Sequence, residues 1–246
     1  MWEIYDKLIE PIPEDIYVED CIMGLRWTYI KGKNSGIALT FRDGLRESSI
    51  LGKIKGMRLK ELSTYVKSWN FTEASLGLSA INSFYNTVEH AEKLGANFSE
   101  GRKNDIFTES IDEIRGKNVA VIGHFPDLEK IESICNLSIL ERRPSKGDLP
   151  DCACEYILKN QDFVFITGST LANKTLPRLL ELSKNAKVIL VGPSVPVAPI
   201  LFDYGVNTLA SAVIVNDNLI QQAIKEGGSH QIFDLGGKMA KIKKKD

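Results

Sequence analysis

The sequence predicts an α/β protein of two domains, and the order of its patterns supports this prediction. From residue 105 onward, short apolar runs alternate with helical patterns, as in a doubly wound parallel sheet of the Rossmann type. Before residue 105 the strand patterns come first and helical patterns follow, which is typical of an α+β domain. A chain of 246 residues is long enough for two modest cores. We therefore expect an α+β domain over 1–104 and a Rossmann-like domain over 105–246.

The first domain is expected to begin with a helix over 1–10 that Pro11 ends. The apolar residues of this helix share one side: Trp2, Tyr5, Leu8 and Ile9. The segments 18–31 and 37–41 are rich in β-branched and aromatic residues, and a Gly- and Asn-containing stretch separates them. This pattern predicts a hairpin with a longer loop.

Two helical patterns follow, over 58–68 and from residue 72 to Gly95. Gly77 inside the second helix costs about 1 kcal/mol relative to Ala, which indicates close approach by another backbone or by a ligand. Ser75 and Asn82 lie beside the apolar stripe of this helix and are candidate ligand-binding residues. The alternative is that this face packs against the second domain.

The second domain shows strands and helices in alternation. Strands are expected over 119–123, 137–141, 162–168, 187–192 and 208–216. Helices are expected over 126–135, 150–159, 176–185 and 217–226. The charged stretch from Lys238 to Lys245 is interpreted as a solvated chain end.

Ligands of open parallel sheets bind outside the carboxyl ends of the strands, so the residues that follow each predicted strand are candidates. Gly123 ends the first strand, but the three-glycine dinucleotide fingerprint is missing, which disfavours a typical NAD site. Glu141 could accept ribose hydroxyls, or it could be an exposed residue beside Arg142. The predicted ligand-binding residues here are Gly123, Phe125, Pro126, Glu141, Arg142, Thr167, Gly168, Ser169, Thr170, Asn173, Thr175, Gly192, Pro193 and Ser194.

The segment 168–175 follows a strand and precedes a helix with nearly the spacing of a phosphate-binding loop, but Asn173 stands where the second glycine should be. Nucleotide hydrolysis is therefore disfavoured, and we expect the loop to offer hydroxyl and amide groups to a ligand. His124 directly follows the first strand and is the candidate acid, base or metal ligand, the alternative being a structural hydrogen-bonder. Arg26 and Arg42 could bind an anion in the same cleft.

Composition narrows the classes of partner. The formal net charge of −1 does not favour nucleic acid or an anionic membrane as a partner. We find no secretion signal or membrane-spanning run, so we expect a cytoplasmic protein with reduced thiols. Cys152 and Cys154 are interpreted as thiols on a helix surface, because residues two apart on a helix do not share a face. We assign no metal site to these residues.

Several strings resemble a family of bacterial and archaeal proteins described as "putative heavy-metal chelation". They are Gly-His-Phe-Pro (123–126), Ile-Thr-Gly-Ser-Thr-Leu-Ala-Asn-Lys-Thr (166–175), Gly-Pro-Ser-Val-Pro (192–196), Leu-Phe-Asp-Tyr-Gly (201–205) and Ala-Ser-Leu-Gly-Leu-Ser-Ala-Ile-Asn (74–82). The resemblance implies an enolase N-terminal-like domain followed by a Rossmann-like domain. This chain departs from the family pattern at Val195, where Thr is usual, and at Lys174, where Gly is usual.

The resemblance implies that a small heteroaromatic or nucleoside-like metabolite, of the pterin, flavin or siderophore type, binds in a cleft between the domains. Condensation or hydrolysis of that metabolite is the chemistry that the resemblance implies. His124, singled out above by its place after the first strand, is our candidate acid–base group for it. The alternative is non-catalytic binding of a metal chelate or metal ion. A third reading is methyl transfer from S-adenosylmethionine. The sequence does not decide whether the cofactor is a metal chelate or an S-adenosylmethionine-like nucleoside. An association into homodimers is compatible with the sequence.

Overall fold

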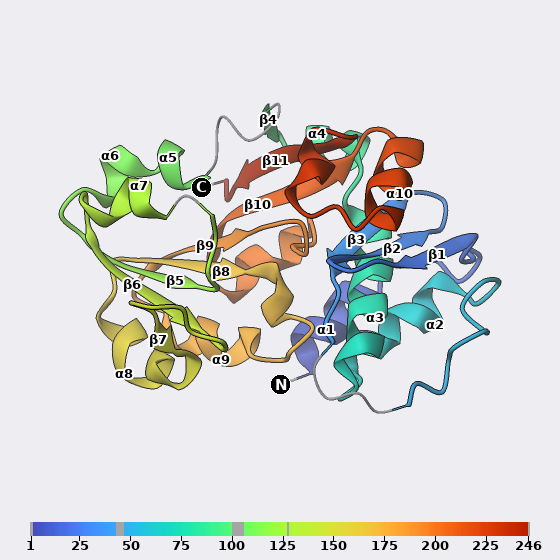
Figure 1. Ribbon diagram of the computed structural model, residues 1–246, viewed down its shortest axis with the longest axis horizontal. Coiled ribbons are helices and arrows are strands. Elements are labelled where there is room, and N and C mark those ends of the chain that lie inside the picture. Colours follow the sequence, from blue (N-terminus) through green and yellow to red (C-terminus); the bar gives the residue numbers. More distant parts are fainter. Residues whose placement is uncertain (1, 43–46, 100–105, 127, 246) are drawn as a thin grey trace.

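The computed structural model describes residues 2–42, 47–99, 106–126 and 128–245, and its centre is an eight-stranded sheet (Figure 1). The strand order is β4 (Asn97–Ser99), β11 (Gly237–Lys243), β10 (Val206–Ile214), β9 (Lys187–Val191), β8 (Phe163–Thr167), β5 (Asn118–Ile122), β6 (Asn136–Glu141) and β7 (Leu149–Pro150). The strands from β7 to β10 are parallel, and they follow the Rossmann order, in which the chain reverses direction across the sheet between β5 and β8. The predicted fold class is confirmed.

Both faces of this sheet are covered, because successive residues of each parallel strand point to opposite sides. Val119 and Val121 of β5 pack in one cluster with Leu128 and Ile131. That face lies under the short helices α5 (Ile106–Glu109), α6 (Ile111–Ile114) and α7 (Glu129–Glu132). The other face belongs to a larger cluster that continues into the first domain and includes α8 (Cys154–Ile157) and α9 (Leu176–Leu182).

The crossover segments contain less regular helix than the sequence predicts. Among the described residues of the expected helix over 126–135, α7 supplies the four that are α-helical. The expected helix over 150–159 is divided into η2 (Asp151–Ala153), α8 and η3 (Leu158–Asn160). By contrast, α10 (Asp217–Lys225) ends one residue before its predicted end, and the side chain of Asn216 caps its start.

The first domain is a three-stranded antiparallel sheet, β1 (Asp20–Met23), β2 (Trp27–Lys31) and β3 (Ser35–Leu39), beside α2 (Leu59–Thr64) and α3 (Phe71–Tyr85). The predicted single strand over 18–31 is wrong, because the chain turns in its middle. The N–H of Gly24 donates to the carbonyl of Trp27 at 2.9 Å and closes that turn. The first helix, α1 (Glu3–Ile9), matches its prediction closely.

The single helix expected from residue 72 to Gly95 is two helices. α3 ends at Asn86, which has φ −90° and ψ 58°, and α4 (Val88–Lys93) then begins with Thr87 as its cap. The Thr87 side chain accepts the His90 N–H at 3.0 Å. The break turns the chain from the first domain toward β4.

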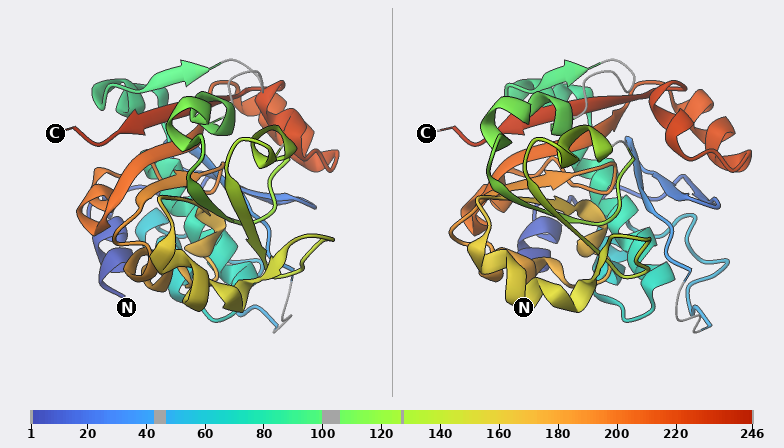
Figure 2. Two further views of the ribbon diagram at one scale, coloured as in Figure 1. Left: turned by 90° about the vertical axis from the view of Figure 1, so that its left-hand side faces the viewer. Right: turned by 60° about the vertical axis from the view of Figure 1, so that its left-hand side comes forward.

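The lysine-rich C-terminal stretch is a strand and not a solvated end, which corrects the prediction. β11 pairs antiparallel with both β10 and β4. Its residues alternate, so that Ala240 and Ile242 are buried while Lys241 between them and Lys243 after them are more exposed. Figure 2 shows β11 and β4 side by side at one edge of the large sheet. The predicted domain boundary at 104–105 lies outside the described residues. No helix in the described part of the chain is long and apolar enough to cross a membrane.

Candidate functional site

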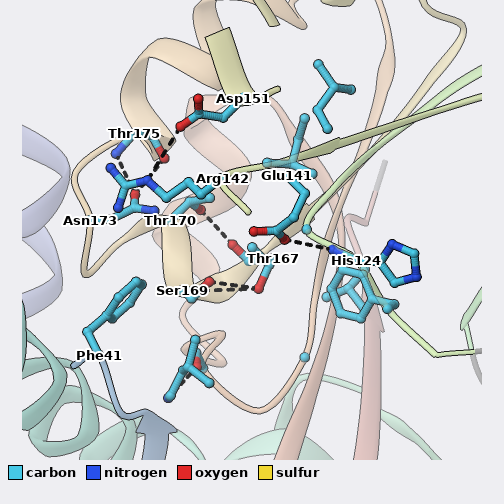
Figure 3. A pocket seen from close by; sticks show the side chains of 18 of the residues that line it. Phe41, His124, Glu141, Arg142, Asp151, Thr167, Ser169, Thr170, Asn173 and Thr175 are labelled. Atoms are coloured by element: carbon cyan, nitrogen blue, oxygen red, sulfur yellow. Dashed lines mark hydrogen bonds and ion pairs between the residues drawn. The ribbon is translucent and has the colours of Figure 1, made fainter. Parts of the chain in front are cut away.

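A cavity of about 1030 Å³ opens at the carboxyl ends of β5, β6, β8 and β9, opposite the end of β3 (Figure 3). It includes the carboxyl ends of the adjacent strands β5 and β8, where the strand order reverses, which is the usual ligand position in open α/β sheets. Most of the predicted site residues line it: Gly123, His124, Phe125, Pro126, Glu141, Arg142, Thr167, Ser169, Thr170, Asn173, Thr175, Gly192, Pro193 and Ser194. The strand ends therefore converge as the sequence indicates.

Three predicted residues lie behind the cavity wall. Gly168 packs against the next loop, because a Cβ there would lie 2.5 Å from the Val195 backbone nitrogen. The Ser75 hydroxyl accepts the Phe41 N–H at 3.0 Å. The fully buried Asn82 donates to the carbonyl of Ile37 at 2.8 Å. These residues hold the wall in place and are not among those that line it.

Two glycines with left-handed backbone border an aromatic ring on the floor of the cavity. Gly123 and Gly192 have φ of +100° and +104°, a backbone region that favours glycine. A Cβ at either position would lie 3.6–3.7 Å from the Phe125 ring. Phe125 in turn packs on Phe107 of α5, with ring centroids 5.4 Å apart. A second ring, that of Phe41 at the end of β3, faces the cavity from the first domain.

The side chain of Glu141 is hydrogen-bonded to the backbone of His124. The Glu141 carboxylate accepts the N–H of His124 at 3.0 Å and that of Arg143 at 3.2 Å. The prediction that Glu141 accepts ribose hydroxyls stays untested, and each oxygen keeps a second lone pair for a ligand. The His124 ring contacts Asp148, a residue that the sequence analysis did not single out. Its Nδ1 lies 3.0 and 2.9 Å from the two carboxylate oxygens.

The loop after β8 is held by its own side chains. The Thr167 and Ser169 hydroxyls lie 3.0 Å apart, and the Thr170 hydroxyl donates to the Thr167 carbonyl at 2.6 Å. Asn173 accepts both the N–H of Thr175 at 3.1 Å and its hydroxyl at 2.6 Å. Figure 3 shows these groups facing Phe41 across the cavity. The positions of these side chains are therefore fixed before any ligand binds.

The cavity wall has an excess of positive charge. Arg142 pairs with Asp151 at 3.5 Å, and its guanidinium lies over the Phe71 ring at 5.5 Å. Arg178 pairs with Glu155 at 2.7 Å, which holds the pKa of that carboxyl below its usual value. Among the described residues the lining includes three carboxylates, Glu141, Asp151 and Glu155, and six cationic side chains, namely Arg26, Arg42, Arg142, Arg143, Lys174 and Arg178. The predicted contribution of Arg26 and Arg42 to this wall is consistent with the geometry.

Lys174 is unusual in backbone and environment. Its φ of +68° is left-handed, the one such value among the non-glycine residues described. The residue is 7% exposed, and its ammonium donates to the carbonyls of Ser68 and Ala172. Burial lowers the pKa of this amine to about 8. The contact with Ser68 links the second domain to the first.

The two neighbouring cysteines differ, which corrects the prediction of two surface thiols. Cys152 is exposed and lines the cavity. Cys154 is buried, and burial raises the pKa of its thiol to about 12. Both residues border the cavity, one from η2 and the other from α8, and they differ in burial. No group of three or more His, Cys, Asp or Glu side chains in the described part of the chain is arranged to hold a metal ion.

Comparison with known proteins places this geometry in a family. Two family models, both described as "putative heavy-metal chelation", match residues 5–85 and 105–243. The chain belongs to this family. A protein of unknown function from Desulfitobacterium hafniense has a crystal structure that agrees with this fold at a TM-score of 0.91, with 40% identity and 99% of both chains covered.

Two archaeal proteins extend the comparison. An uncharacterised protein of Methanocaldococcus jannaschii is 31% identical over 243 residues, which are 92% of this chain and 90% of that protein. A protein of unknown function from Pyrococcus horikoshii shares the fold at a TM-score of 0.80, with 23% identity and 98% of both chains covered. Family members thus keep both domains together over nearly the full length of this chain.

Proposed function

We propose that the chain binds a flat, anionic, heteroaromatic or nucleoside-like metabolite in the cavity between its domains. The observation that carries this proposal is the charge of the wall: among the described residues, six cationic side chains and three carboxylates line it, in a protein of net charge −1. A concave surface with one dominant sign of charge concentrates ligands of the opposite sign. An anionic ligand would therefore be drawn to this cavity.

The aromatic residues support the flat shape of the ligand. Phe41 and Phe125 line the cavity from different domains, and Gly123 and Gly192 border the Phe125 ring. Rings of this kind stack on planar heterocycles. The cavity volume of about 1030 Å³ is at the upper end of the roughly 300–1,000 Å³ of small-molecule sites. A two- or three-ring heterocycle with a charged tail, of the pterin or flavin type, would fit within it.

Recognition of a metal chelate is the second candidate. It is favoured by the description of the family and by the lack, in the described residues, of a three-ligand group for a bare metal ion. A siderophore-like chelate is anionic and partly aromatic, so the same arginines and phenylalanines would recognise it through its organic part. Both candidates use one site and differ in whether metal is required for binding.

The test is a thermal-shift panel on metal-stripped protein with pterin, pterin-6-carboxylate, flavin mononucleotide, S-adenosylmethionine and catecholate chelates with and without iron. A ligand at a hundredfold excess over its Kd adds about 2.7 kcal/mol, which raises the midpoint by roughly 5–10 °C. We expect pterin-6-carboxylate to shift the midpoint more than pterin does. The proposal fails if no anionic heterocycle shifts it, and a shift only with the iron-loaded chelate selects the second candidate.

A matched pair of variants locates the binding. Arg142→Gln removes a cationic side chain from the wall, whereas Arg115→Gln removes an exposed one that does not line the cavity. We expect Arg142→Gln to weaken binding of the active compound about tenfold and Arg115→Gln to leave it unchanged, because a charge-assisted contact contributes roughly 1.5–3 kcal/mol. Equal affinities in the two variants would place the ligand elsewhere.

A further inference from the structure

We propose that His124 and Asp148 form a catalytic acid–base dyad in the cavity wall, in which Asp148 positions the ring and His124 exchanges protons with the bound ligand. The inference rests on the proposed function, because it assigns the chemistry done at that cavity. It goes beyond binding by naming the group that acts and the residue that orients it.

The contact between the two side chains fixes the protonation pattern of the ring. The Nδ1 of His124 lies 3.0 and 2.9 Å from Oδ1 and Oδ2 of Asp148. An ionised carboxylate can only accept hydrogen bonds, so Nδ1 must carry the proton and donate it. The lone pair of the neutral ring is then on Nε2. This is the arrangement by which a carboxylate orients a general base in hydrolytic enzymes.

Asp148 is built to stay in this position. Its side chain is only 2% exposed, and its Oδ2 also accepts the Ser145 N–H at 2.8 Å. Gly147, with φ of +100°, forms the turn just before Asp148 in the loop that follows β6. Burying a carboxylate costs free energy unless it is hydrogen-bonded. The contacts with the His124 ring and the Ser145 N–H meet this requirement and hold the Asp148 side chain in place. No residue further away needs to move for the dyad to form.

The other side of the ring is open. The His124 side chain is 45% exposed and lines the cavity, and Nε2 has no hydrogen-bond partner in the part of the chain that the structure describes. The backbone of His124 is fixed by its N–H bond to Glu141 at 3.0 Å. His90 offers a contrast, since its Nε2 contacts the carbonyl of Val197 at 3.0 Å. Of these two histidines, His124 alone combines a fixed Nδ1 with an open Nε2.

The chemistry follows from this geometry. The Nε2 of His124 takes the proton of an O–H group, from water or from a hydroxyl of the ligand, and the electron pair of that bond stays on the oxygen. The oxygen is then a nucleophile toward an acyl carbon of the ligand. As the new C–O bond forms, the bond from the acyl carbon to the leaving oxygen or nitrogen breaks, and its electron pair goes to that leaving atom. The imidazolium, stabilised by the Asp148 carboxylate, returns the proton to the leaving atom. The substrate class is thus an anionic heterocycle with a hydrolysable ester or amide bond.

The first test is the tautomer of His124 in ligand-free protein, read from long-range ¹H–¹⁵N spectra at pH 9. The chain has three histidines, and His124→Gln assigns the signal. We expect a protonated Nδ1 and a bare Nε2 in the wild type. In Asp148→Asn the amide oxygen is expected to keep the Ser145 N–H, so the amide N–H faces Nδ1 and moves the proton to Nε2. A wild-type ring protonated at Nε2 overturns the proposal even if the variant does not fold.

The second test is the hydrolysis of p-nitrophenyl acetate, a probe of accessible basic imidazole. We expect the rate of each variant, His124→Gln and Asp148→Asn, to fall by at least about tenfold. This threshold is set under the roughly 10²–10⁴-fold that a positioned acid–base group supplies. Asp162→Asn is the matched control, because its carboxylate accepts the Asn118 N–H at 2.9 Å and does not line the cavity. A rate unchanged by His124→Gln overturns the proposal.

The two proposals fail separately. The tautomer is measured without ligand, so a wrong tautomer refutes the dyad while leaving the binding proposal intact. An empty ligand panel with the expected tautomer refutes the binding proposal and leaves the dyad as a site for another substrate class.

Discussion

Gly77 of α3 lies against the backbone of Val66, so closely that a Cβ at residue 77 would be 2.1 Å from the Val66 nitrogen. In an unobstructed helix, replacing Gly with Ala stabilises by about 1 kcal/mol. Here the contact is with backbone, which cannot rotate away, so we expect Gly77→Ala to destabilise the protein by about 3 kcal/mol or more. The urea unfolding midpoint measures this effect.

Gly32→Ala is the matched control. A Cβ there would meet only side-chain ends, those of Ile16 at 3.2 Å and Leu59 at 3.4 Å, which can shift by a few tenths of an ångström. We expect Gly32→Ala to change the free energy of unfolding, obtained from the urea midpoint, by less than about 1 kcal/mol. A Gly77→Ala protein as stable as the wild type would contradict the close packing of α3 on Val66.

Gly77 also shows how far sequence reasoning reaches. A glycine inside a helical pattern predicts that something comes close, and that prediction is confirmed. The pattern does not say what approaches, and here it is the preceding 3-10 helix, η1 (Tyr65–Lys67), of the same domain. The identity of the neighbour depends on how α2 and η1 return along α3, which is set by packing over the whole domain and not by local propensity.

The residues of the candidate site likewise fall into those that sequence reasoning could predict and those that it could not. Residues that directly follow strands, such as His124 and Glu141, could be predicted because the end of an apolar run fixes their place at the sheet edge. Asp148 and Arg178 could not, because their positions depend on the return path of loops and on a helix from another part of the chain. The lysines of β11 were misread because charge was weighed above the alternation of Ala240 and Ile242.

Asn86 is expected to be a major link between the domains. Its side chain donates to the carbonyl of Val195 at 2.9 Å and accepts the N–H of Val197 at 2.8 Å, and it also contacts Ser211 and Ala212. Asn86→Ala leaves buried backbone groups without this partner, so we expect a loss of about 2–4 kcal/mol in unfolding free energy. Chemical denaturation measures it.

The exposed Asn185 provides the control for Asn86. Asn185→Ala removes the same amide from the surface and should change stability by less than about 0.5 kcal/mol. If both variants lose equally little, the Asn86 hydrogen bonds do not contribute to the stability of the folded chain.

Thiol reactivity is expected to separate Cys152 from the other cysteines. Burial raises the pKa of the Cys21 thiol to about 11 and that of Cys154 to about 12, whereas Cys152 is exposed. Because the thiolate is the reactive form, native protein should show one fast-reacting thiol with DTNB at pH 8. Cys152→Ser should remove this phase, and a ligand that fills the cavity should slow it. A fast phase that persists in Cys152→Ser would contradict this assignment.

Lys174 is expected to make stability depend on pH above neutrality. Burial lowers the pKa of its amine from the ordinary 10.5 to about 8 in the folded protein. Between these two values the unfolded chain keeps a proton that the folded chain has released, so folding becomes more favourable as pH rises, by roughly 1–3 kcal/mol in all. Lys174→Met has no such proton, and the stability of the wild type relative to this variant should therefore rise from pH 7.5 to pH 10 in urea titrations. Comparing the two proteins cancels the titration of the buried thiols, which acts in the opposite direction.

Lys184→Met, at an exposed position, is the control, and its stability should change with pH in parallel with that of the wild type across the same range. A Lys174→Met curve parallel to the wild type would mean that the amine keeps its proton in the folded state, held by the carbonyls of Ser68 and Ala172.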